Sequence, residues 1–159
     1  MLVRCVTFRL SSGLPPELNG LLEDFRLVVN SAIRAGLSTR VSSRNAITRQ
    51  LYTAFREEHP RIYAQHLVSA FEVAAGILKN HRKQIRKGRS CKTPFVKRLM
   101  MKAENQAYKL DRAEGMIDLP IRAGCHVKLR LIVSQYHRRY LDDETLSLGS
   151  LTVLPNRVI

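Results

Sequence analysis

The chain has 159 residues, enough for one ordinary domain or two small lobes, with the apolar and charged fractions of a soluble globular protein, 45% and 25%. Its 27 Lys and Arg outnumber its 13 Asp and Glu, for a net charge of +14. A domain this basic repels itself unless it meets a polyanion, so we expect nucleic acid as its partner. No apolar run reaches the roughly 18 residues of a membrane span, so no membrane is expected among its partners.

Cysteine usage and the first residues favour a cytoplasmic location. Cys5, Cys91 and Cys125 lie far apart and form no CxxC pair, so neither a zinc ribbon nor a disulfide framework is supported. Reduced thiols are the simpler interpretation. The first ten residues alternate like a strand and lack the apolar core of a secretion signal.

The first half of the chain predicts one strand followed by three helices. Residues 2–10 alternate between two faces, which predicts a half-buried strand. An apolar stripe at three- and four-residue spacing predicts a helix over about 16–35, and Gly36 is a natural stop for it. A second helix fits 43–58, with Ser42 or Ser43 as its cap, and a long third helix fits 61–87.

Two faces of these helices leave an alternative open. Arg26, Asn30 and Arg34 lie four residues apart, either as a solvated face or as a face that contacts a nucleic-acid backbone. The small residues around Ala74 and Gly76 would let a nucleic-acid strand or another helix come close, and helix packing is the favoured use.

The strongest functional signal is a basic run from Lys79 to Arg112. It holds 12 of the 27 Lys and Arg and only two acids, Glu104 and Asp111. The helix dipole favours one or two cations at a helix C-terminus, but not this many, and the run continues beyond the helix. We therefore expect phosphate contacts. The full predicted set for a nucleic-acid backbone is Arg26, Arg34, Arg40, Arg44, Arg49, Lys79, Arg82, Lys83, Arg86, Lys87, Arg89, Lys92, Lys97, Arg98 and Lys102.

The second half of the chain predicts strands. Residues 116–119, 125–133 and 151–154 have strand patterns, and 157–159 would begin another, which suggests a fragment of a longer protein. No linker separates the halves, so we expect the first strand to pair with the later ones across a helical insertion. The predicted class is α+β: a small wedge-like or OB-like β-barrel of residues 1–11 and 92–159, with a lobe of about three helices, 12–91, inserted into it.

The search for catalytic chemistry predicts no catalytic residue, no metal and no cofactor. No nucleotide-binding glycine motif and no G-x-S-x-G occurs. The three consecutive acids Asp142, Asp143 and Glu144 fit a solvated turn better than a metal site, because such a site needs carboxylates from different elements. Tyr108 and Tyr136 lie among cations and could stack bases or pack in a core.

Taken together, several short motifs resemble the N-terminal part of TnpB, an RNA-guided DNA endonuclease encoded by insertion sequences and related to type V CRISPR effectors. They are the strand ending in F-R-L, the helical F-R-x-V-x-N at 25–30, the long helix from Tyr63, and the G-M-I-D-L-P strand at 115–120. The resemblance covers essentially the whole chain. It departs at Val29, where the family often has an aromatic residue.

The resemblance implies a wedge barrel with an inserted recognition lobe that binds guide RNA and a short motif in the target DNA. The RuvC-like nuclease domain, with its Mg²⁺, is absent from this chain, so the chain itself would not cleave. By position, the residues implied for the target motif are Arg61, Gln65, Ser69, Asn105 and Gln106.

Two other functions remain open. A stand-alone DNA-binding regulator, or an RNA-binding accessory protein, would use helices 43–58 and 61–87 as a helix-turn-helix-like pair. A complete small enzyme would use the acids at 142–144. An open sheet edge would in addition allow a homodimer.

Overall fold

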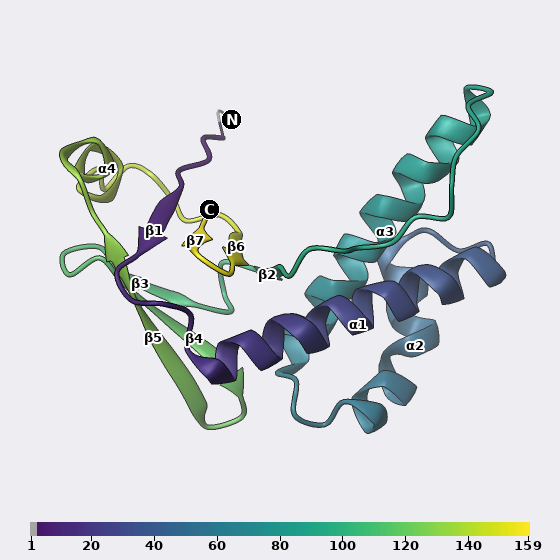
Figure 1. The fold of residues 1–159 in the computed structure, drawn as a ribbon, viewed down its shortest axis with the longest axis horizontal. Coiled ribbons are helices and arrows are strands. Elements are labelled where there is room, and N and C mark those ends of the chain that lie inside the picture. Colours follow the sequence, from purple (N-terminus) through teal and green to yellow (C-terminus); the bar gives the residue numbers. More distant parts are fainter. Residues whose placement is uncertain (1–2) are drawn as a thin grey trace.

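The computed structural model describes residues 3–159, and within them the chain forms a mixed α+β fold with a sheet beside a group of helices (Figure 1). Three helices follow the first strand: α1 (Pro16–Ser38), α2 (Arg44–Glu58) and α3 (Ala64–Arg86). A fourth, α4 (Gln135–Leu141), is separated from them by most of the sheet (Figure 1). The strands are β1 (Phe8–Leu10), β2 (Met101–Ala103), β3 (Lys109–Asp111), β4 (Met116–Arg122), β5 (Cys125–Ile132), β6 (Leu151–Leu154) and β7 (Arg157–Val158).

The sheet is open and antiparallel, in the order β2-β6-β7-β1-β5-β4-β3. The prediction that the first strand pairs with later strands across the helices is confirmed, because β1 lies between β5 and β7. The predicted wedge-like or OB-like β-barrel is wrong, because the sheet does not close. The two edge strands, β2 and β3, do not pair with each other, and each is only three residues long.

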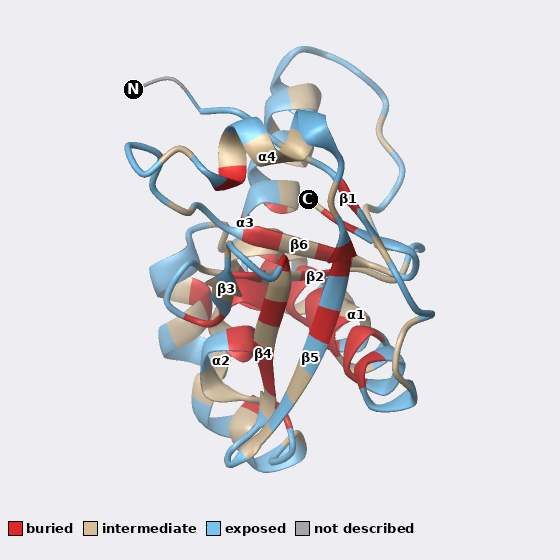
Figure 2. Cartoon of the chain, turned by 90° about the vertical axis from the view of Figure 1, so that its left-hand side faces the viewer, coloured by how far each residue is buried: buried red, intermediate tan, exposed pale blue. Residues whose placement is uncertain are grey.

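The strands follow the alternation of the sequence. In β5, Leu129 and Leu131 are buried while Lys128 and Arg130 are exposed, so the predicted two-faced pattern is confirmed (Figure 2). The predicted first strand is too long: among its described residues only Phe8–Leu10 pair with neighbours, and Leu2 lies outside the described residues.

The helical core forms where α1 crosses α3. Phe25, Val28 and Ala32 of α1 are buried, as are Phe71 and Leu78 of α3. These side chains recur every three or four residues, so each helix presents one apolar stripe to the other. The predicted bounds of the helices are right to within a few residues.

Gly36 does not end the first helix as expected. The helix continues to Ser38, and Gly36 is buried, where an added Cβ would meet the side chain of Leu78 and the carbonyl oxygen of Val41. The left-handed backbone that a helix end often needs comes instead at Arg40, with φ of 57°. Gly36 is therefore needed because it lets α1 and α3 pack closely.

His66 joins the helices to the sheet. Its side chain is fully buried, and its Nε2 lies 2.7 Å from the carbonyl oxygen of Pro120 on β4. Burial lowers the pKa of His66, although the bond to Pro120 opposes that effect. The ring is therefore neutral at ordinary pH, and Nε2 donates the hydrogen bond.

Candidate functional site

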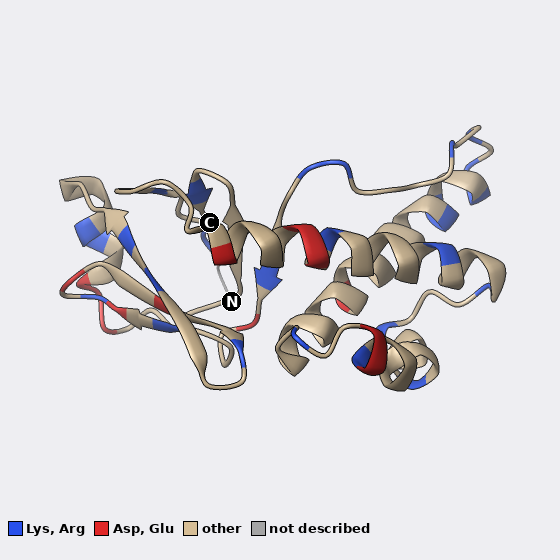
Figure 3. Cartoon of the chain, turned by 60° about the horizontal axis from the view of Figure 1, so that its bottom comes forward, with Lys and Arg blue, Asp and Glu red and all other residues tan. Residues whose placement is uncertain are grey.

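The C-terminal half of α3 gathers four cations at one shallow groove. Figure 3 shows this end of the helix, and the loop after it, with Lys and Arg blue and no acid beside them in that view. A depression of about 290 Å³ is lined by Ser42, Lys79, Arg82, Lys83 and Arg86. We call these four cations the basic ridge. The sequence predicted a larger cluster here, which also included Lys87, Arg89 and Lys92, and these three do not line the groove.

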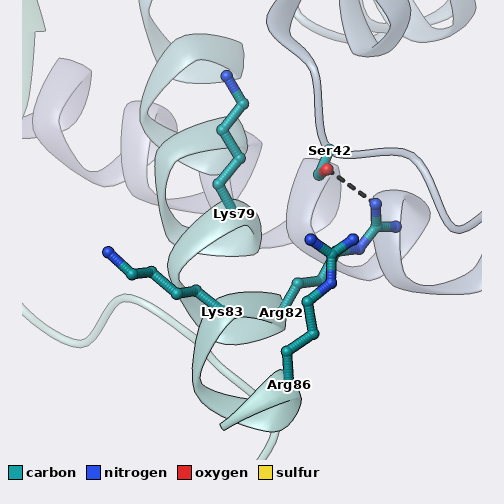
Figure 4. Close-up of a pocket in the computed structure, with 5 residues that line it drawn as sticks. All are labelled: Ser42, Lys79, Arg82, Lys83 and Arg86. Atoms are coloured by element: carbon teal, nitrogen blue, oxygen red, sulfur yellow. Dashed lines mark hydrogen bonds between the residues drawn. The ribbon is translucent and has the colours of Figure 1, made fainter.

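The loop before α2 holds one member of the basic ridge in place. The guanidinium of Arg82 donates a 2.8 Å hydrogen bond to the hydroxyl of Ser42, and Figure 4 shows it turned towards that loop. Ser43, not Ser42, caps α2 by accepting from the amide of Ala46, so the Ser42 hydroxyl is left to accept from Arg82. Adjacent serines thus serve two purposes.

The ridge cations lack acidic partners. Within residues 3–159 no ion pair involves Lys79, Arg82, Lys83 or Arg86. Four positive charges within two turns repel one another, and the repulsion is relieved when a polyanion replaces their counterions. The geometry suits phosphate groups better than a single small anion, because the groove is open and its cations point in different directions (Figure 4).

A second pocket lies on the same helix, nearer its N-terminus. It has a volume of about 180 Å³, and the residues that line it, besides Val68, are Arg44, Gln65, Ser69, Glu72, Glu104 and Gln106. We call it the polar pocket. Ser69 is 1% exposed, and its hydroxyl has no hydrogen-bond partner in the protein. A buried hydroxyl without a partner is costly, so water or a ligand that bonds it would be favoured.

The acids of the polar pocket are held by cations of the protein. Lys102 lies 3.1 Å from Glu72 and 2.9 Å from Glu104, and Arg44 lies 3.6 Å from Glu72. Burial disfavours the charged form of Glu72, but the hydrogen bond and charge of Lys102, together with Glu104 and Arg44, hold its pKa below the usual value. Burial also opposes the charge of Lys102, yet Glu104 and Glu72 raise its pKa. Lys102 is thus tied to these carboxylates, although it was predicted to bind a nucleic-acid backbone.

The structure brings together three of the five residues predicted to contact a target motif. Gln65, Ser69 and Gln106 line the polar pocket, and Gln106 comes from the β2–β3 connection rather than from the helix. Arg61 and Asn105 are exposed and do not line this pocket. Amides and a hydroxyl that share a pocket can both donate and accept hydrogen bonds, as the edges of bases do.

The two sites lie along one face of α3. Gln65, Glu72 and Lys79 are seven residues apart, about two helical turns each, so they share a face, and Lys83 and Arg86 continue it. The distance from Gln65 to Arg86 along the axis is about 30 Å at 1.5 Å per residue. Gly76 lies between the two sites; it is exposed, and an added Cβ would meet only open space. Because Gly76 has no side chain, nothing projects from this face of α3 between the two sites.

The small residues of α3 divide between the two uses considered from the sequence. Ala70, Ala74 and Ala75 are buried, so they serve helix packing, whereas Gly76 is on the free face. Helix packing is therefore the main use, as favoured.

The polar face of α1 binds an extended segment of the same chain. Asn30 donates to the carbonyl of Val96 at 3.0 Å and accepts from its amide at 2.7 Å, as a paired strand would. Arg26 donates to the carbonyl of Lys97 at 3.2 Å. This segment, 92–100, is a strap along α1. Both alternatives considered from the sequence, a solvated face and a nucleic-acid contact, missed that role for Arg26 and Asn30.

Asn30 gives a direct test of the strap. In Asn30→Ala the amide of Val96 loses its acceptor, and we expect its hydrogen exchange to accelerate and the protein to lose about 1–2 kcal/mol of stability. Arg34→Ala is the matched control, since Arg34 lies one turn away and, among residues 3–159, its side chain bonds Ser31 and not the strap. Equal exchange at Val96 in the two variants would show that the strap is held by other contacts.

The remaining predicted cations are spread over the helical side. Arg34, Arg40, Arg44, Arg49, Lys87, Arg89, Lys92, Lys97 and Arg98 are all exposed. Lys97 lies 5.4 Å from the ring of Phe95, which is 61% exposed on the strap. Arg89 donates to Gln84. Of these cations only Arg44 lines one of the two pockets described, and it is paired there with Glu72.

Tyr108 is a core residue, so its predicted alternative role in stacking is not supported. It is 9% exposed, and its hydroxyl donates to the carbonyl of Gly149 at 3.0 Å. Burial also raises its pKa. Tyr136, by contrast, is 54% exposed on α4. Sequence reasoning did not predict this helix, although Ser134 before it was a recognisable N-cap signal.

The acids at 142–144 form a turn, as preferred from the sequence. Asp143 accepts hydrogen bonds from the amide and hydroxyl of Thr145, which lower its pKa, and Asp142 lies 3.6 Å from Arg138. Across residues 3–159 no three His, Cys, Asp or Glu side chains are grouped so that they could hold a metal ion. Nor does any helix in that range combine the length and apolar character needed to cross a bilayer.

Fold and site define a small basic α+β protein with a cationic groove and a polar pocket along one face of α3. The chain belongs to the Uncharacterized protein MJ0013 family, whose model matches residues 21–117, more than half of the chain. The match includes most of α1, all of α2 and α3, and the strap, and it stops before α4. A search of curated proteins finds no match to the chain.

Proposed function

We propose that this chain binds nucleic acid, as the N-terminal recognition part of a TnpB-like RNA-guided DNA endonuclease without its nuclease domain. The observation that carries the proposal is the basic ridge: four cations without acidic partners, which line one open groove in a chain of net charge +14. Such a groove suits the phosphate backbone of a guide RNA. The resemblance of the sequence to that family and the helices placed after the first strand support the assignment. A wedge-like role for the sheet, a cytoplasmic setting and the absence of catalysis belong to the same proposal.

In this proposal the polar pocket reads the DNA motif beside the target. Gln65 and Ser69 of α3 and Gln106 of the β2–β3 connection line this pocket. The Ser69 hydroxyl, which has no partner in the protein, can form a hydrogen bond with a base. A glutamine amide can donate and accept at once, which suits the major-groove edge of adenine. The backbone of the bound strand would pass over Gly76 towards the basic ridge.

The proposal is tested by measuring the affinity of the whole chain for a labelled hairpin RNA and a labelled DNA duplex over a salt series. We expect the logarithm of the association constant to fall linearly with the logarithm of salt, by about 0.7 to 0.9 for each phosphate contacted, with tighter binding of RNA. Failure to bind either ligand at low salt would overturn the proposal. Preference for a palindromic duplex, together with a dimer in solution, would instead identify the chain as a stand-alone DNA-binding regulator.

Gly76 supplies a separate prediction about the path of the bound strand. Gly76→Leu should stabilise the protein by about 0.5–1 kcal/mol, since Leu favours helices and its side chain meets open space. It should also weaken RNA binding several-fold, because the added side chain would block the face between the two sites. Gly20→Leu on α1 is the control, with the same open surroundings and no effect expected on binding. Thermal unfolding by circular dichroism and the binding assay measure the two effects.

Equal RNA affinity in Gly76→Leu and Gly20→Leu would show that no strand crosses this part of α3. The basic ridge would then act alone, and the polar pocket would need another ligand.

A further inference from the structure

The short helix α4 presents two tyrosines and an arginine on its outer side. Tyr136, Arg139 and Tyr140 are spaced three and four residues apart, so they share one helical face. The tyrosine hydroxyls lie 3.3 Å apart, and the rings meet edge to face with centroids 5.3 Å apart. Tyr136 is 54% exposed, a large fraction for an aromatic side chain.

The cations that act on these tyrosines have no acidic partners. Hydrogen bonds with Tyr136 and Arg4 lower the pKa of Tyr140, and the charges of Arg4 and Arg139 act in the same direction. Neither arginine forms an ion pair among residues 3–159. The acid nearest in sequence, Asp142, is paired with Arg138.

The inner side of α4 fixes the outer side in place. His137 accepts from the amide of Ser134 through Nδ1, so its Nε2 is protonated and donates to the carbonyl of Thr7, 3.0 Å away. Its ring stacks on Phe8 of β1 with centroids 4.5 Å apart. Arg138 donates to the carbonyls of Arg112 and Ala113. A surface held this firmly loses little conformational entropy when a ligand binds.

We infer that Tyr136, Tyr140 and Arg139 form a second binding site, the α4 platform, for an unpaired nucleotide. An exposed phenol ring stacks a base irrespective of its sequence, and the guanidinium of Arg139 on the same helical face holds a neighbouring phosphate. A paired base offers no free face, so the platform selects single-stranded nucleic acid. The sheet separates α4 from the basic ridge, which places the platform at the other end of the molecule (Figure 1).

The inference rests on the proposed function only in taking nucleic acid as the ligand, because its residues lie outside the basic ridge and outside the part matched by the family. One nucleic acid with both paired and unpaired regions could reach both sites.

The test measures binding of a labelled oligothymidylate of about 12 nucleotides, and of a duplex of equal length, to the whole chain by fluorescence anisotropy. Tyr136→Leu should weaken binding of the single strand about 10-fold, while Tyr136→Phe should stay within about two-fold because its ring still stacks. Duplex affinity should be unchanged in both variants. Arg139→Gln should weaken single-strand binding more than Arg122→Gln, which removes another exposed charge, at the β4–β5 turn.

Three results would overturn the inference. If Tyr136→Leu binds the single strand with wild-type affinity, Tyr136 does not stack a base. If the variants lose equal affinity for single strand and duplex, the platform acts only through its charge. A wild-type dimer that Tyr136→Leu dissociates would make this face a contact between copies of the chain. If the platform variants keep wild-type affinity while variants of the basic ridge lose binding, the inference fails and the proposed function stands. If the wild type binds no nucleic acid, both fail.

Discussion

Replacing Lys79, Arg82, Lys83 and Arg86 together by Ala should lower the affinity for a hairpin RNA by about 100- to 1000-fold near 0.1 M salt. Each cation that neutralises a phosphate releases a counterion, so the salt dependence should become shallower by about 3 to 4 in logarithmic slope. The fold should survive. These side chains are on the surface, and the protein hydrogen bond lost is that of Arg82 to Ser42.

The matched control removes the same charge from the sheet. Lys109, Arg122, Lys128 and Arg130 are exposed, and no salt bridge or side-chain hydrogen bond involves them among residues 3–159. Replacing these four by Ala leaves the net charge of the ridge variant, +10, since four cations are lost from +14 in each. Similar losses in both variants would mean that total charge, not the basic ridge, decides binding.

The arrangement of helices was predictable because each buried face repeats over several turns. In α1, nine buried residues from Leu18 to Gly36 recur at helical spacing, which local periodicity reveals without any knowledge of the partner surface. The same holds for β5, where alternation continues over eight residues. The basic ridge could be found for a similar reason: its cations follow one another on a single helix.

Features that depend on distant contacts were not predictable. Whether a sheet closes depends on how its edge strands meet, and β2 and β3 are too short to show an alternating pattern. The strap on α1 needs Asn30 and Val96, 66 residues apart, and an asparagine on a polar face gives no sign of its partner. Ser42 and Arg82 meet across the groove for the same reason, although each belongs to a predicted element or its boundary.

Charge in the sequence also overstated the number of free cations. Lys102 belongs to the basic run, yet strand β2 places it between Glu72 and Glu104. Arg112 ends the run and donates to the carbonyls of Asp143 and Leu146. Because carbonyls and acids far along the chain take up these donors, only the fold shows which cations can still meet a phosphate.

Shortening Leu78 and filling Gly36 should each destabilise the protein, and the two changes should compensate each other in part. Leu78→Ala removes a fully buried side chain where α3 meets α1 and should cost about 3 kcal/mol. Gly36→Ala places a Cβ against Leu78 and should cost about 1–3 kcal/mol. In the double variant the shortened side chain on α3 makes room for the methyl group added on α1, so we expect the cost to fall below the sum by at least about 1 kcal/mol.

The energies come from guanidinium unfolding followed by circular dichroism, which suits a chain without Trp. Gly20→Ala is the control, and it should stabilise, because its Cβ would meet open space on the same helix. Strict additivity would mean that α1 and α3 separate slightly when Gly36 is replaced. A wider crossing of α1 and α3 would also change the groove of the basic ridge. The amide of Val41 donates to the carbonyl of Gly36, and Ser42 follows Val41. Ser42 would therefore move away from Arg82. RNA affinity should then fall in Gly36→Ala although no ridge cation has changed.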